Sequence, residues 1–390
     1  MPAVRPLHVG LVVGEHSGDQ LGFKLMQALR QRLGPDGVRF SGTAGEAMEH
    51  EGMASLFPLS DIAVMGILPV LARYPTLLRR GYAVVDAVIA DPPDVLVIID
   101  SPDFTHAVAR RVRRRLPQLP IIDYVSPSVW AWRPGRARAM RAYVDHVLAL
   151  LPFEPAAHAE LGGPACTYVG HPLIERLAEL RPGTPEEVAA RAGETPLLLV
   201  LPGSRRSEIR RLLGAFGATV AQVMADGPGP LDVVVPAVSN LEVEIRAGVA
   251  TWPVPARIIT GEAAKLAAFR RARAALAASG TVSLELALAG VPMVIAYKVS
   301  KLEEQLKYII RASSIVLPNL VLGENVVPEF MQSDAEPGRL AAALVPLLDD
   351  GPARATQLAG FARVAAAMIL PGGETPSGRA ADVILTAAGR

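Results

Sequence analysis

The feature that most constrains the fold is a repeated alternation of short apolar runs and helix-like segments. The runs end at Gly, Pro or Ser and fall at residues 7–13, 95–99, 119–125, 144–151, 196–201, 231–236, 274–278 and 292–297. Strands that alternate with helices are typical of parallel sheets with right-handed crossovers. We therefore expect an α/β protein with two Rossmann-like, doubly wound domains and a cleft between them.

A stretch rich in Pro, Gly and charge suggests the domain boundaries. Residues 181–196 (RPGTPEEVAARAGETP) have no strong apolar period, and we expect them to link an N-terminal domain, 1–180, to a C-terminal domain, 197–350. Residues 351–390 read as Ala-rich helices, broken near Leu370-Pro371-Gly372-Gly373. They are expected to pack back on the N-terminal domain or on a second copy of the chain, so a homodimer is left open.

Composition excludes several classes of function. A chain that is 51% hydrophobic and 20% charged folds around a large core, and a net charge of +1 gives no argument for nucleic acid, so no such partner is expected. The single cysteine, Cys166, and the scattered histidines lack metal-ligand spacing, so we expect no metal. No stretch reaches the roughly 18 apolar residues of a spanning helix, which favours a cytoplasmic, soluble or peripheral protein.

Polar loops follow the strands of the N-terminal half, at the sheet edge where open α/β sheets bind ligands. The loop GEHSGD carries Glu15 and Ser17, and the loop IDSPDF carries Asp100 and Asp103. A carboxylate at a strand end, walled by apolar residues, can act as a general base. The alternative is helix capping, by Ser17 or Asp19 in the first loop and by one of the two aspartates for a helix that starts near Thr105.

The segment DYVSPSVWAWRPGR, residues 123–136, concentrates two indoles and a cationic cluster just past a strand end. It contains Ser126, Trp130, Trp132 and Arg133 in a chain with only 5% aromatic residues. Such a group favours ligand binding, whereas the alternative is core tryptophans beside a solvated basic turn.

Two Gly-centred turns in the C-terminal half are typical of a nucleotide-diphosphate site. In LPGSRRSEIRR, Gly203 and Ser204 offer backbone N–H groups at a helix N-terminus, and Arg205 adds a forked cation. In ASGTVSLELALAG, a carboxylate on the first turns of a helix can grip two ribose hydroxyls. Each turn alone could be a capped turn, but together they predict a UDP-sugar site formed by Gly203, Ser204, Arg205, Ser279, Gly280, Thr281, Glu285, Asn319 and Gln332.

An ordered set of motifs resembles the lipid-A-disaccharide synthase family of GT-B glycosyltransferases. The motifs are GEHSGD, AVMGI, IDSPDF, YVSPSVWAWR, LPFE, YVGHPL, LPGSR, ASGTVSLE, PMVIAYK and LPNLVLGENVVPEF. The resemblance implies that UDP-2,3-diacylglucosamine is joined to 2,3-diacylglucosamine 1-phosphate, with inversion at the donor's anomeric carbon. The product is a β-1,6-linked disaccharide, UDP is released, and neither a metal nor a cofactor is implied.

A single displacement of this kind needs one base on the acceptor 6-hydroxyl and charge stabilisation on the departing UDP. We expect Asp103 to be the base, with Asp100 as second choice and Glu15 beside them. Ser17, Ser126, Trp130, Trp132 and Arg133 are the candidate acceptor-binding residues. The alternatives are another GT-B enzyme of UDP-sugars, such as an epimerase or a transferase with a different acceptor, and a non-catalytic nucleotide-sugar-binding module.

Residues 62–75 (IAVMGILPVLARYP) are nearly all apolar and carry one charge, Arg73. The same half of the chain holds the basic runs 110–115 and 133–141. An apolar patch rimmed by cations suits anionic lipids, so a peripheral contact with the inner membrane is expected. The alternative is a buried helix.

Overall fold

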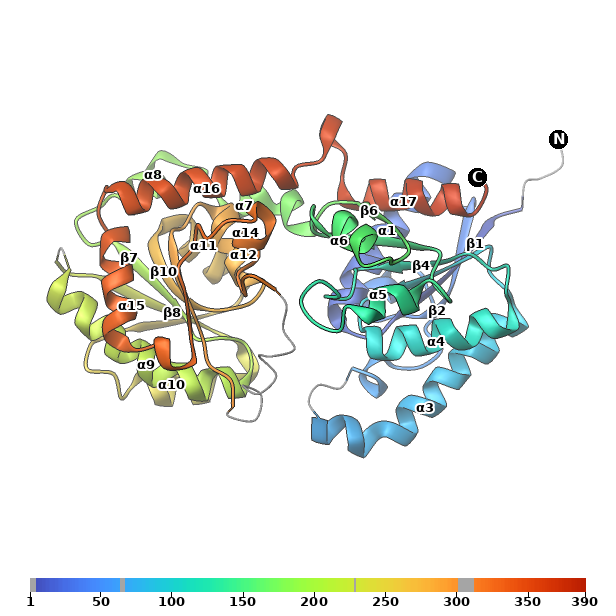
Figure 1. Ribbon diagram of the computed structural model, residues 1–390, viewed down its shortest axis with the longest axis horizontal. Coiled ribbons are helices and arrows are strands. Elements are labelled where there is room, and N and C mark those ends of the chain that lie inside the picture. The colour runs from blue at the N-terminus through green and yellow to red at the C-terminus, as the bar shows by residue number, and fades with distance from the viewer. Residues whose placement is uncertain (1–4, 64–66, 228, 301–311) are drawn as a thin grey trace. The chain divides into compact units, whose positions relative to one another are not determined.

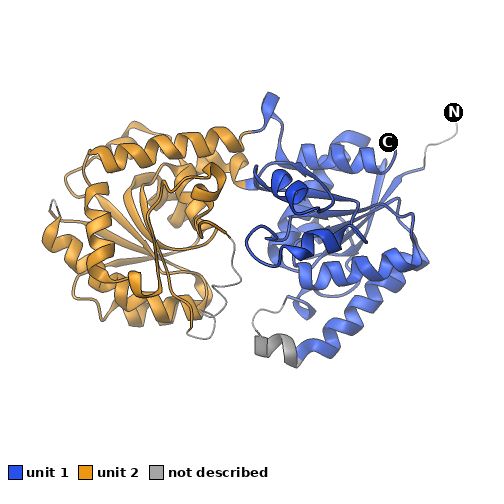
Figure 2. Ribbon diagram, viewed as in Figure 1, with its two compact units in different colours: residues 1–172, 370–390 blue, residues 173–369 orange. Residues whose placement is uncertain are grey.

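The computed structural model describes residues 5–63, 67–227, 229–300 and 312–390, with the backbone alone at 67–72. The chain forms two compact units (Figure 2). Unit 1 comprises Met1–Pro172 and Leu370–Arg390, and unit 2 comprises Leu173–Ile369. The chain therefore leaves unit 1 once and returns to it for its last residues.

Unit 1 is built on a six-stranded parallel sheet in the order β2-β1-β3-β4-β5-β6 (Figure 1). Its strands are β1 (Leu7–Val13), β2 (Val38–Thr43), β3 (Val95–Ile99), β4 (Ile121–Tyr124), β5 (His146–Ala149) and β6 (Ala165–Tyr168). All residues of β1 and β3 are buried, as expected for central strands covered on both faces.

Helices cover both faces of this sheet. They are α1 (His16–Leu33), α2 (Glu46–His50), α3 (Ile67–Ala90), α4 (Pro102–Arg115), α5 (Gly135–Met140), α6 (Glu154–Glu160) and α17 (Pro376–Ala387). One core joins α1, α2 and α17 to one face, and a second core joins α3, α4 and α5 to the other. Leu96 and Ile98 enter one core and Val97 enters the other, because successive strand residues point to opposite faces.

Unit 2 repeats this architecture with strand order β12-β11-β10-β7-β8-β9. The strands are β7 (Leu197–Leu201), β8 (Asp232–Ala237), β9 (Arg257–Thr260), β10 (Ala272–Ala278), β11 (Met293–Tyr297) and β12 (Glu329–Met331). The helices are α7 (Leu177–Leu180), α8 (Pro185–Arg191), α9 (Arg206–Asp226), α10 (Glu242–Val249), α11 (Glu262–Arg271), α12 (Val282–Ala289), α14 (Leu317–Leu322), α15 (Pro337–Leu344) and α16 (Pro352–Met368). One core packs α9, α10 and α15 on the sheet.

The unit boundaries differ from the expected domains. The stretch expected as a linker, 181–196, lies within unit 2 and contains α8, where Thr184 caps the helix through Glu187 N. Arg191 anchors α8 because its guanidinium donates to the carbonyls of Phe269, Arg270, Ala289 and Gly290. Charge and proline made this stretch resemble a linker, although its arginine is used for packing.

The C-terminal helices divide between the units near the expected break at residues 370–373. Helix α16 belongs to unit 2, whereas α17 packs on α1 of unit 1. Ala380, Ala381 and Ile384 enter the unit 1 core, and Arg32 makes two hydrogen bonds to Asp382 of 2.9 and 3.1 Å. The chain's own tail therefore completes unit 1.

The predicted fold class is confirmed, because both described sheets are parallel and flanked by helices. Within the described residues, every helix is too short or too polar to cross a bilayer. Most of the apolar segment 62–75 lies outside the residues whose side chains the structure describes.

Candidate functional site

In unit 1, the loops after β1 and β3 interlock through two hydrogen bonds. Ser17 Oγ donates to Asp100 Oδ2 over 2.6 Å, and Ser101 Oγ donates to Glu15 Oε1 over 3.0 Å. The loops approach closely at Gly14, where an added Cβ would lie 2.5 Å from Ser101 Cβ. The two carboxylates predicted from separate motifs, Glu15 and Asp100, are thus held in one polar cluster at the carboxyl edge of the sheet.

The backbone at this cluster is strained. Asp100 and Ser101 have φ angles of 56° and 47°, in the left-handed region that residues with a side chain seldom adopt. Hydrogen bonds hold the conformation, because Asp100 N donates to Tyr124 O over 3.0 Å and Thr105 Oγ1 donates to Asp100 O over 2.7 Å. Strain that the surroundings maintain in this way is concentrated at functional sites.

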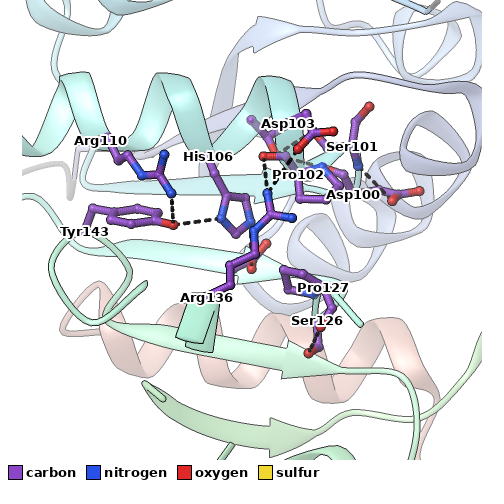
Figure 3. Close-up of polar contacts among 12 residues, drawn as sticks. Asp100, Ser101, Pro102, Asp103, His106, Arg110, Ser126, Pro127, Arg136 and Tyr143 are labelled. Carbon is purple, nitrogen blue, oxygen red and sulfur yellow. Dashed lines mark hydrogen bonds and ion pairs between the residues drawn. The ribbon is translucent and has the colours of Figure 1, made fainter. Parts of the chain in front are cut away.

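Asp103 lies in a different environment from Asp100. It occupies the first turn of α4, its side chain is 94% exposed, and Arg136 Nη2 lies 3.3 Å from its Oδ1 (Figure 3). Arg136 also donates to the carbonyl of Pro102 over 3.2 Å. Asp103 is therefore near the cluster in sequence but is a solvated carboxylate with one cationic partner.

The capping alternatives predicted for these loops are wrong. Helix α1 begins at His16 and α4 at Pro102, each without a side-chain cap. Asp19 instead accepts hydrogen bonds from the N–H groups of Gly45, Ala47 and Met48, at 2.9–3.1 Å, at the start of α2. Both helices begin earlier than the apolar pattern indicated, so these side chains lie inside or before the first turn.

The tryptophan loop after β4 is anchored by a buried carboxylate. Trp130 Nε1 donates to Glu154 Oε1 over 3.1 Å, Leu151 N donates to Glu154 Oε2 over 3.0 Å, and the Trp130 ring meets Phe153 edge-on at 5.1 Å. Trp130 is therefore partly a packing residue. Burial raises the pKa of Glu154 to about 7, against the opposing effect of these two donors.

The other candidate acceptor residues divide into exposed and buried groups. Trp132 is 43% exposed, and the guanidinium of Arg133 stacks 4.2 Å from its ring centroid. Ser126 is buried, and its Oγ lies 2.8 Å from His158 Nε2. Trp132 and Arg133 are thus available to a ligand, whereas Ser126 already has a partner.

Sequence reasoning missed a buried polar group behind this loop. His106 Nε2 lies 3.1 Å from Asp123 Oδ2, both side chains being buried, and His106 Nδ1 lies 3.1 Å from the hydroxyl of Tyr143 (Figure 3). Arg110 donates to the same hydroxyl over 3.0 Å. The only available signal was an aspartate in the strand IIDY, which alternation alone does not connect with a histidine on the preceding helix.

The raised pKa of Glu154 predicts a pH-dependent stability. A carboxyl whose pKa rises on folding stabilises the fold at low pH, and that contribution is lost as pH rises from about 4.5 to about 7. The stability difference between the wild type and Glu154→Gln should therefore change by up to about 3 kcal/mol across this range, in favour of the variant at higher pH.

Urea unfolding, followed by tryptophan fluorescence at about pH 5 and about pH 7.5, measures this difference. Glu160→Gln is the matched control, because Glu160 lies on the same helix and is exposed. An equal difference at both pH values would contradict the assignment of the raised pKa to Glu154.

Unit 2 contains a pocket of about 520 Å³ at the carboxyl ends of its strands. It brings together seven of the nine residues predicted for the UDP-sugar site, namely Gly203, Ser204, Arg205, Ser279, Gly280, Thr281 and Glu285. A cavity of this size suits a nucleotide-sized ligand. Both predicted Gly-centred turns therefore line one concave site.

The phosphate-binding geometry predicted for the first turn needs a correction. Glu208 Oε2 already accepts hydrogen bonds from the N–H groups of Ser204 and Arg205, at 3.1 and 3.3 Å, and its Oε1 lies 3.2 Å from Arg205 Nη1. The loop leaves β7 through Gly203 at a φ of 113°, which brings its backbone against Glu208. The carboxylate that caps α9 thus occupies donors that the sequence offered to a phosphate.

Asn319 and Gln332 do not line the pocket. The buried amide of Asn319 accepts from the N–H groups of Val326 and Val327 and donates to Val327 O, at 2.9–3.0 Å. Gln332 Oε1 accepts from Val299 N over 2.7 Å. In this structure both side chains hold loops together.

The pocket also contains residues that the sequence reasoning missed, including Glu208, Ser239, Gly261, Glu262 and Lys265. Glu262 and Lys265 follow β9, whose sequence RIIT holds only two apolar residues and is half-buried. A strand this short gives little alternation, so its carboxyl end was not recognised as part of the site.

The two Rossmann-like units and the pocket define the GT-B class, and the comparisons with known proteins agree. MurG of Acinetobacter baumannii superposes with a TM-score of 0.59 at 14% identity, over 98% of this chain and 100% of that one. A putative UDP-N-acetylglucosamine 2-epimerase from Listeria monocytogenes gives 0.61 at 13% identity, over 98% and 95% of the two chains. At these identities the likeness shows the fold alone.

The family follows from sequence. The model of the lipid-A-disaccharide synthetase family matches residues 9–367. The lipid-A-disaccharide synthase of Rhodopseudomonas palustris (strain HaA2) is 57% identical over 384 residues, which cover 98% of this chain and 96% of the relative. That of Rhodospirillum centenum is 45% identical over 98% and 95%. The chain belongs to the lipid-A-disaccharide synthetase family, which confirms the resemblance read from the motifs.

Proposed function

We propose that the chain transfers 2,3-diacylglucosamine from UDP to the 6-hydroxyl of 2,3-diacylglucosamine 1-phosphate and releases UDP. Membership of the family carries this proposal, and the nucleotide-sized pocket supports it. The anomeric C–O bond to the β-phosphate breaks, a β-1,6 bond forms, and the acceptor's hydroxyl proton passes to a base. The leaving UDP takes the bonding electron pair.

The contacts in unit 1 favour Asp100 as that base, ahead of Asp103. Asp100 is fixed by Ser17 and by the N–H of Ser101, which donates to its Oδ1 over 2.8 Å, and its strained backbone holds the carboxylate at the strand end. A base must be held within reach of the proton it takes. Asp103 is solvated and faces Arg136, so its carboxylate is less well oriented.

Donor binding belongs to the pocket of unit 2. Glu285 projects into it from α12 and suits two ribose hydroxyls, and Arg205 suits the diphosphate. For acceptor binding, the stacked pair of Trp132 and Arg133 offers an apolar face and a cation to a phosphorylated sugar.

The product of the reaction tests this function directly. Purified protein, UDP-2,3-diacylglucosamine and 2,3-diacylglucosamine 1-phosphate should give a disaccharide 1-phosphate, identified by its mass, and one UDP per product. Free diacylglucosamine would indicate hydrolysis, an altered monosaccharide would indicate an epimerase, and bound but unchanged donor would indicate a binding module. Each of these three results contradicts the transferase assignment.

We also propose that unit 1 meets its lipid substrates at a membrane surface through α3 and α4. Tyr74 and Tyr82 on α3 are 54% and 53% exposed, and the guanidinium of Arg111 on α4 stacks 4.9 Å from the Tyr82 ring centroid. Exposed aromatic rings beside cations suit the headgroup region of an anionic bilayer. Such a contact would let acyl chains reach the protein without crossing water.

Vesicle co-sedimentation checks this contact. Tyr74→Glu should pellet severalfold less than the wild type with anionic vesicles at low salt, since one near-surface charge contributes about 1 kcal/mol. Val243→Glu, which changes an exposed apolar residue of unit 2, is the matched control. Equal pelleting of both variants would exclude Tyr74 from the contact, and no pelleting of the wild type would exclude the membrane proposal itself.

A further inference from the structure

We propose that Lys265 is a positioning residue that orients Glu285 toward a ribose and so makes the pocket select ribonucleotides over 2′-deoxyribonucleotides. This inference rests on the proposed binding of UDP in unit 2. The motif carrying Glu285 predicted a ribose contact, but nothing in the sequence connected that carboxylate with a lysine twenty residues earlier on another helix.

The lysine grips both oxygens of the carboxylate. Lys265 Nζ lies 3.1 Å from Glu285 Oε1 and 3.0 Å from Oε2, and 3.4 Å from Glu262 Oε2. Its position is fixed on two further sides, because it lies 5.5 Å from the Phe269 ring centroid and Glu262 is held by Arg176 over 3.0 Å. The ammonium is therefore a fixed point against which the Glu285 carboxylate is aligned.

A carboxylate aligned in this way can still bind a diol. Its two oxygens offer about four lone-pair sites, so two remain after contact with the lysine. The Glu285 side chain is only 14% exposed, which leaves few directions from which a ligand can reach those sites. A lysine that fixes the plane of the carboxylate therefore also fixes where two vicinal hydroxyls can donate.

The charge of the pocket gives the lysine a second effect. Among the described lining residues, Glu208, Glu262 and Glu285 are acidic, whereas Arg205 and Lys265 are basic. Removing Lys265 would leave Glu285 half-desolvated and unpaired, free to rotate and repelling a diphosphate. Alignment and charge predict different results, because only alignment distinguishes a ribose from a 2′-deoxyribose.

Calorimetric titration with UDP and with 2′-deoxy-UDP separates these effects. The wild type should prefer UDP by about 10-fold or more, the scale of one hydrogen bond to a charged group. Lys265→Met should lower that ratio to below about 3-fold. Lys265→Arg should restore part of it, and Arg271→Met, at an exposed position of the same helix, should leave it unchanged. Circular dichroism checks the folding of each variant.

A double-mutant cycle with Glu285→Gln completes the test. If the lysine acts through the carboxylate, Lys265→Met should not change the ratio further in the Glu285→Gln background. Equal weakening of both nucleotides by Lys265→Met would show a role in charge or folding and overturn the inference. An unchanged ratio in Lys265→Met would also overturn it. Failure of the wild type to bind UDP would instead remove the proposed donor site, and the inference with it.

Discussion

Replacing Asp100 by asparagine should lower turnover by about 100-fold or more while changing the affinity for the UDP donor little. The amide keeps an oxygen that can accept from Ser101 N, and asparagine tolerates the left-handed backbone conformation at this position. The variant should therefore fold normally and lose only the ability to take the acceptor's proton. Steady-state kinetics with both substrates measures the effect.

Asp103→Asn is the matched comparison, because it removes one carboxylate charge three residues away, on the first turn of α4. It should cost much less than Asp100→Asn, since Asp103 is solvated and contacts Arg136 only through a 3.3 Å hydrogen bond. A large loss in Asp103→Asn with near-normal turnover in Asp100→Asn would reverse the assignment.

The sequence predicted the fold well because its central strands are buried on both faces. The runs at 7–13 and 95–99 coincide with β1 and β3, since a continuous apolar run flanked by glycine or polar residues has few other interpretations in an alternating chain. It did not predict β9 or β12, which are short and only partly buried. Edge strands of this kind lack the apolar signal that marks a central strand.

The candidate sites could be predicted as loops but not as contacts. Parallel strands bring their carboxyl ends to one edge, so Glu15 and Asp100 could be expected there together. The order of the two aspartates could not, because it depends on the strained backbone at Asp100 and on the hydrogen bond from Ser17. Similarly, the position of Glu208 against Ser204 N is set by helix capping, which spacing alone does not distinguish from phosphate binding.

Replacing Arg205 by alanine should weaken UDP binding by about 1.5–3 kcal/mol, or roughly 10- to 150-fold, the scale of a lost charge-assisted hydrogen bond. The Arg205 side chain is 65% exposed, and its contact with Glu208 leaves most of the guanidinium free to meet a diphosphate. Arg206→Ala is the matched control, since Arg206 is 61% exposed, pairs with Glu244 over 2.9 Å and does not line the pocket.

The comparison of nucleotides locates the lost contact. Calorimetry should show that Arg205→Ala weakens UDP strongly and uridine little, because uridine has no phosphate for the guanidinium to bind. The N–H groups of Ser204 and Arg205 donate to Glu208, so the side chain of Arg205 is the principal donor that this loop offers to the diphosphate. Equal losses for both ligands would mean that Arg205 supports the loop instead. An unchanged UDP affinity would remove Arg205 from the site and would require the diphosphate to displace Glu208 from the backbone.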